Sequence, residues 1–176
     1  MKSKKISRRD FVKNAAIGSA ALGTGSVLGS TDNEQRQFKG EMKPEKVVEL
    51  LNQDITGEID AIMTYMRNAF VSELCEPAHE LEEVGIDEMR HVDWLADLVT
   101  EFGGIPTMEH HELSFGGNTH EDFLIRSIEL EKKAINQYND HIKMIDHKEV
   151  IEVLKVIVWE ENKHLKAFNE ILEKLS

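Results

Sequence analysis

Acidic and imidazole side chains recur in two copies of one pattern along the chain. Each copy has a Glu, a Tyr seven residues later and, thirty residues after the first Glu, a second Glu followed three residues on by a His. The copies are offset by 73 residues and comprise Glu58, Tyr65, Glu88, His91, Glu131, Tyr138, Glu161 and His164. A single Glu-x-x-His is common on solvated helices, whereas two copies at matched distances are hard to obtain as surface decoration. The repeat therefore indicates a site with internal two-fold symmetry.

The residue types and their spacing suit metal binding. Residues three apart lie on the same face of an α-helix, so each Glu-x-x-His can reach one ion. Four carboxylates in an apolar interior would repel one another or take up protons unless cations neutralise them. Carboxylates with imidazole and no thiolate suit iron or manganese better than structural zinc. The sequence therefore predicts two bound metal ions, with the ligands Glu58, Glu88, His91, Glu131, Glu161 and His164.

Four helical segments are expected to position these ligands. Apolar residues recur at helical spacing over segments that begin near Pro44, Pro77, Thr119 and Asp146. Gly103 and Gly104, followed by Pro106, end the second segment. Residues 105–118 lack clear periodicity and are numerous enough to run the length of a bundle, whereas the other two links are short. We predict an all-α four-helix bundle of two antiparallel hairpins joined by one long crossover.

The first thirty residues have the features of an export signal. Arg8 and Arg9 precede Phe11 and Lys13, and a weakly apolar run rich in Ala and Gly follows. That run is too short and too rich in glycine for a membrane span, which needs about 20 apolar residues. We interpret residues 1–30 as a twin-arginine (Tat) signal peptide that directs the protein to the periplasm or cell envelope, with no stable membrane span after processing. A disordered basic tail is the alternative.

Composition and charge narrow the function further. The net charge is −12, and because residues 1–30 carry six basic and one acidic side chain, the remainder carries −17. Such a charge repels nucleic acid and attracts cations. Cys75 is the single cysteine, so the chain has neither an intramolecular disulfide nor a Cys-x-x-Cys iron site. Residues 31–43 are polar and expected to be a flexible leader, and residues 44–176 form the bundle.

The motifs around the repeat resemble those of bacterioferritins, di-iron proteins of the ferritin-like superfamily. The resemblance covers residues 44–176 and rests on Glu58 to Tyr65, Ile86-Asp87-Glu88-Met89-Arg90-His91, Leu130-Glu131 and Glu161-Asn162-Lys163-His164. It implies a ferritin-like bundle with two Fe ions per chain, manganese being the alternative. It further implies ferroxidase activity, in which oxygen or hydrogen peroxide oxidises Fe(II) for iron storage, sequestration or protection against oxidative stress. A homo-oligomer is expected.

The resemblance also implies individual roles. Glu58 and His91 would serve one ion, Glu131 and His164 the other, and Glu88 and Glu161 would bridge the two. Tyr65 would lie beside the site as a hydrogen-bond partner or one-electron donor. Met89 occupies the position at which bacterioferritins carry a haem-binding methionine, and one step along the helix turns it about 100° away from the metal site. Haem b at Met89 and a plain apolar interface residue are both open.

Two other functions stay open. One is a peroxide-consuming di-metal enzyme, either a rubrerythrin-like reductase, which the lack of Cys-x-x-Cys weakens, or a manganese catalase. The other is a non-catalytic bundle that binds haem or metal. Asp54, one turn before Glu58, is either a residue that orients a ligand histidine or an exposed carboxylate. The Glu-His-His-Glu segment at 109–112 is either a surface metal site or a solvated loop.

Overall fold

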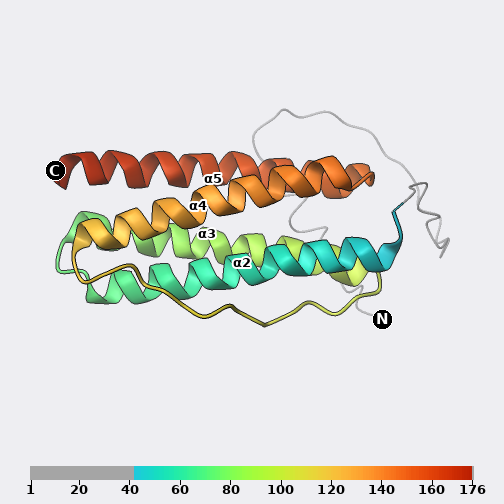
Figure 1. Ribbon diagram of the computed structural model, residues 1–176, viewed down its shortest axis with the longest axis horizontal. Coiled ribbons are helices and arrows are strands. Elements are labelled where there is room, and N and C mark those ends of the chain that lie inside the picture. The colour runs from blue at the N-terminus through green and yellow to red at the C-terminus, as the bar shows by residue number, and fades with distance from the viewer. Residues whose placement is uncertain (1–41, 176) are drawn as a thin grey trace, which may run out of the picture. The chain divides into compact units, whose positions relative to one another are not determined.

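The computed structural model describes residues 42–175, which contain four long α-helices and no β-strand (Figure 1). The helices are α2 (Pro44–Val71), α3 (Cys75–Glu101), α4 (His120–Met144) and α5 (Lys148–Leu175). The predicted signal peptide at 1–30 and the leader up to residue 41 lie outside the described residues. Within the described part, no helix is long and apolar enough to cross a membrane.

The local sequence explains where the helices begin. Pro44 is at the start of α2, where its missing N–H removes no helical hydrogen bond. Thr119 caps α4: its side chain accepts the Asp122 N–H at 3.1 Å, and the Asp122 carboxylate accepts the Thr119 N–H at 3.1 Å. α3 begins at Cys75, two residues before the predicted start, because Pro77 is tolerated within a first turn.

The helices pair as two hairpins. α2 packs against α3 and α4 packs against α5, while α2 also packs against α4 and α3 against α5. Residues 102–119 run back alongside α2 without regular structure and connect the hairpins (Figure 1). The predicted all-α arrangement of two antiparallel hairpins with one long crossover is therefore confirmed. One face of the bundle is formed by α2 and α4, and the opposite face by α3 and α5.

Polar side chains spaced eight residues apart on α2 hold the crossover in place. Each binds backbone groups of the crossover that lack helical partners, at distances of 2.9–3.2 Å. The bonded pairs are Asn52 with Ile105 and Thr107, Asp60 with His111, and Asn68 with Phe115. The His111 side chain also binds Asp60, with Nδ1 2.6 Å from Oδ2. This histidine of the 109–112 segment therefore fastens the crossover to α2.

The apolar core is divided into two clusters. One contains Val47, Leu50, Leu51 and Ile55 of α2 with apolar side chains of the other three helices, and the second begins at Ala61 on α2. Each helix passes from one cluster to the other at the position of its predicted ligands. The metal-binding repeat therefore lies in the middle of the bundle, with apolar side chains sealing it at both ends.

Candidate metal centre

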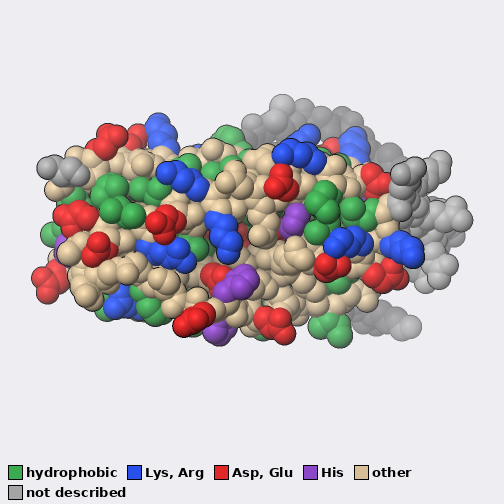
Figure 2. Space-filling view, in the orientation of Figure 1, with side chains coloured by type: hydrophobic (Ala, Val, Ile, Leu, Met, Phe, Trp, Pro, Cys, Tyr) green, Lys and Arg blue, Asp and Glu red, His purple; other side chains and the backbone are tan. Residues whose placement is uncertain are grey.

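The six predicted ligands converge between the two apolar clusters, and each is at most 5% exposed. They come from all four helices. Their ligand atoms form two groups, each within 4.8 Å: Glu58, Glu88, His91 and Glu161 in the first, and Glu88, Glu131, Glu161 and His164 in the second. Glu88 and Glu161 belong to both groups. By contrast, the face of the molecule in Figure 2 carries acidic, basic and histidine side chains interspersed with apolar ones.

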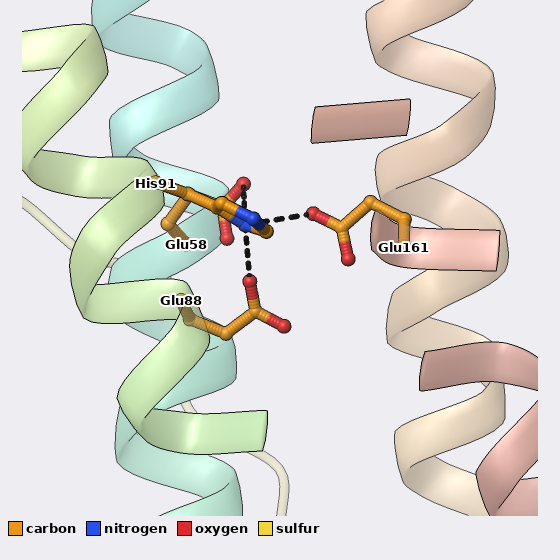
Figure 3. Close-up of side chains that lie close together, drawn as sticks. All are labelled: Glu58, Glu88, His91 and Glu161. Carbon is orange, nitrogen blue, oxygen red and sulfur yellow. Dashed lines mark ion pairs between the residues drawn. The ribbon is translucent and has the colours of Figure 1, made fainter. Parts of the chain in front are cut away.

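In the first group, one imidazole nitrogen faces three carboxylates. His91 Nδ1 lies 2.6 Å from Glu88 Oε2, 3.2 Å from Glu161 Oε1 and 3.8 Å from Glu58 Oε1. Figure 3 shows these carboxylates approaching the imidazole from α2, α3 and α5. Four ligand atoms gathered this closely could hold one metal ion.

The second group repeats this arrangement. His164 Nδ1 lies 3.3 Å from both Glu88 Oε1 and Glu161 Oε2, and 3.9 Å from Glu131 Oε2. The two imidazole rings are 5.9 Å apart between centroids. Because Glu88 and Glu161 present one oxygen to each histidine, they lie where carboxylates bridging two ions would lie.

The polar atoms of this centre fit a pair of cations. Five buried atoms have no directed hydrogen bond: Glu88 Oε1 and Oε2, His91 Nδ1, Glu131 Oε2 and Glu161 Oε1. Buried polar atoms are nearly always hydrogen-bonded, because an unpaired one destabilises the fold. Carboxylate oxygens and imidazole nitrogens are the donor set of iron and manganese. One divalent ion in each group would satisfy these atoms.

Two acidic residues that were not predicted hold the outer nitrogens of the histidines. His91 Nε2 lies 2.9 Å from Glu160 Oε2, and His164 Nε2 lies 3.4 Å from Asp87 Oδ2. Both contacts join one hairpin to the other. A carboxylate at Nε2 fixes the ring orientation and leaves Nδ1 as the metal-binding atom. Asp87 and Glu160 are themselves 73 residues apart, so the repeat held a signal for them.

The two tyrosines bind ligand glutamates of the opposite hairpin. Tyr65 OH donates to Glu131 Oε1 at 2.6 Å, and Tyr138 OH donates to Glu58 Oε1. Burial, together with the nearby carboxylates, raises the pKa of both phenols well above the ordinary value. Both are therefore neutral hydrogen-bond donors that orient a ligand carboxylate.

Asp54 was predicted either to orient a ligand histidine or to be an exposed carboxylate. Both predictions are wrong, because Asp54 is buried and its histidine partner, His141, is not a predicted ligand. Its Oδ1 lies 2.9 Å from His141 Nδ1 and accepts a hydrogen bond from Gln137 Nε2 at 2.8 Å. Asp54 therefore ties α2 to α4. Met89 is exposed on α3, as expected for a side chain turned away from the centre, and its predicted haem contact stays a prediction.

Without bound metal, two acids of the centre favour their protonated forms. Burial raises the pKa of Glu58 and Glu131 well above the ordinary range, and repulsion from Glu88 and Glu161 raises it further. Burial also opposes ionisation of Glu161, but its contacts with the two histidines lower its pKa overall. The protonated acids reduce the repulsion among the four carboxyl groups.

The imidazoles hold protons as well. Burial alone would lower the pKa of His164, but its contacts with Glu161 and Glu88 raise it to about 10. Burial would also lower the pKa of His91, but its contacts with Glu160 and with the ligand carboxylates raise the pKa overall. Metal ions must displace these protons, so binding is coupled to proton release.

Comparisons with known proteins agree with this architecture. The ferritin-like domain family matches residues 48–176, and the chain belongs to that family. The bacterioferritin of Desulfovibrio desulfuricans is 27% identical over 132 residues, which cover 72% of this chain and 74% of that protein. A ferritin-like, diiron-carboxylate protein from Bacillus anthracis has the same fold, with a TM-score of 0.69 at 22% identity over 76% of this chain and 99% of that one. The predicted ferritin-like fold is therefore confirmed.

The raised histidine pKa values predict how stability depends on pH. The folded metal-free protein binds more protons than the unfolded chain between pH 6.5, the ordinary histidine value, and about 10, the value for His164. Its melting temperature should therefore fall as pH rises through this interval. Saturating Mn(II) should remove the fall, because the metal replaces the protons. Circular dichroism melts at several pH values measure both, and a rising melting temperature without metal would contradict the assignment.

Proposed function

We propose that the protein is a di-iron ferroxidase that oxidises Fe(II) with oxygen or hydrogen peroxide. The observation that carries the proposal is the pair of overlapping ligand groups, in which Glu88 and Glu161 are shared. Two ferrous ions held side by side can deliver two electrons to one oxidant molecule. Membership of the ferritin-like family and the similarity to a bacterioferritin support iron as the metal.

The reaction balances with two ions per centre. Each Fe(II) loses one electron, and oxygen that takes up two electrons and two protons becomes hydrogen peroxide. Hydrogen peroxide that takes up two electrons and two protons becomes two water molecules. The four carboxylates, with Asp87 and Glu160 at the outer histidine nitrogens, would favour the more highly charged Fe(III) product because their negative charge would stabilise it.

Several wider expectations stay predictions. Iron storage or sequestration, assembly into a homo-oligomer and export through residues 1–30 are not needed for the oxidation step. Haem at Met89 is also separate from it, because this side chain is exposed outside the ligand groups.

Removing a carboxylate from either ligand group should slow iron oxidation. Glu58→Gln and Glu131→Gln keep the side-chain size but lose the negative charge, and each should lower the initial rate at least about tenfold. Glu49→Gln, an exposed position on α2, is the matched control and should oxidise iron at the wild-type rate. The rate is followed by ferric absorbance after anaerobic protein with two Fe(II) per chain is mixed with oxygen or peroxide. Wild-type rates in both centre variants would contradict the proposal.

We propose that Tyr65 supplies one electron, and passes its hydroxyl proton to Glu131, when peroxide remains after both ferrous ions have been oxidised. Its hydroxyl binds ligand Glu131 at 2.6 Å, so only the Glu131 side chain separates the phenol from the proposed metal position. Wild-type protein mixed with excess peroxide should give a tyrosyl signal in electron paramagnetic resonance that Tyr65→Phe lacks. Tyr138→Phe is the matched control, since Tyr138 makes the equivalent contact with Glu58. A signal that persists in Tyr65→Phe and disappears in Tyr138→Phe would move the role to Tyr138.

A further inference from the structure

A cavity between α2 and α4 reaches the metal centre. The cavity is narrow and partly open to solvent, and all four ligand carboxylates line it together with both tyrosines. On the opposite face, the outer nitrogens of the two ligand histidines are held by Asp87 and Glu160. The centre is therefore approached through the α2–α4 face and closed by polar contacts on the α3–α5 face.

The two-fold repeat of the centre is broken along this cavity. Gly57 and Leu130 both line it and are 73 residues apart, so they are equivalent positions of the two hairpins. Leu130 is buried in the second apolar cluster. A Cβ at Gly57, in contrast, would meet no atom within 4 Å. The space that a leucine fills in one hairpin is therefore open in the other.

The two hairpins also differ in the charge that they place beside the cavity. Asp54 lines the cavity one helical turn before Glu58, so the two carboxylates lie on one face of α2. The equivalent position in the other hairpin is Ser127, whose hydroxyl donates to Phe123 O of its own helix at 3.0 Å. A carboxylate beside a narrow passage with low-dielectric walls attracts cations. Only the Gly57 side of the cavity has such a carboxylate ahead of a metal ligand.

We propose that ferrous ions reach the centre from one side, through the opening beside Gly57, and that Asp54 is the carboxylate that receives them on the way to Glu58. The hydrogen bond from Gln137 and the contact with His141 hold Asp54 in place, so the receiving carboxylate is fixed. The identity of the ion rests on the proposed function. The one-sided route is a separate property and can fail separately.

Gly57→Leu tests the route, because it places at residue 57 the side chain that the equivalent position 130 already carries. Anaerobic Co(II), a probe that oxygen chemistry does not complicate, is mixed with the full chain and followed by its visible absorption. The variant should still bind two ions at equilibrium, but association should slow at least about tenfold. Gly57→Ala is the matched control and should stay within about twofold of the wild-type rate, since its Cβ meets open space.

Asp54→Asn provides an independent test that does not alter the width of the cavity. It keeps the side-chain shape but removes the charge, so association should slow several-fold and depend less on salt. Asp140→Asn, an exposed α4 residue paired with Lys143, is the control and should leave the rate unchanged.

The outcomes separate the two proposals. Gly57→Leu that loads at the wild-type rate, or Asp54→Asn that behaves like its control, would overturn the one-sided route while leaving the ferroxidase proposal intact. A two-ion stoichiometry in the slowed variants shows that their centres are folded. A wild-type protein that binds fewer than two ions would overturn the proposed function, and the route with it.

Discussion

The structure depends on burying four carboxylates and two imidazoles in one small volume. Without compensation, such a group of acids in an apolar interior would cost more free energy than a single domain has to spare. Without metal, protonation reduces the repulsion among the acids, because the pKa of Glu58 and of Glu131 is raised. Divalent cations would do so more effectively, because each could interact with several carboxylates at once. The same carboxylates that destabilise the interior without cations therefore make the centre suited to metal binding.

The rest of the bundle serves this constraint. Two apolar clusters seal the centre at its ends, and each helix contributes a ligand where it passes between them. The polar contacts around the ligands then cross from one hairpin to the other, as in Tyr65 with Glu131 and Glu160 with His91. The site is therefore complete only when the two hairpins are packed together, and the crossover connects them by returning the chain along α2 (Figure 1).

Much of the candidate site could be predicted from the repeat in the sequence. The offset of 73 residues predicted which six side chains meet, because two copies of a hairpin bring equivalent residues to a common axis. Asp87 and Glu160 obey the same offset and were readable in principle. Asp54 with His141 was not, because their equivalents are Ser127 and Asn68 and the contact joins residues 87 apart in the chain. The opening at Gly57 was also hidden, since empty space depends on what the neighbouring helices do not fill.

The most direct measurement is a crystal structure of the protein loaded anaerobically with Fe(II), with anomalous scattering recorded at the iron absorption edge. The account predicts two peaks in each chain, one bound by Glu58 and His91 and the other by Glu131 and His164, with Glu88 and Glu161 contacting both. A single peak, no peak, or iron held only by residues outside these six would contradict it.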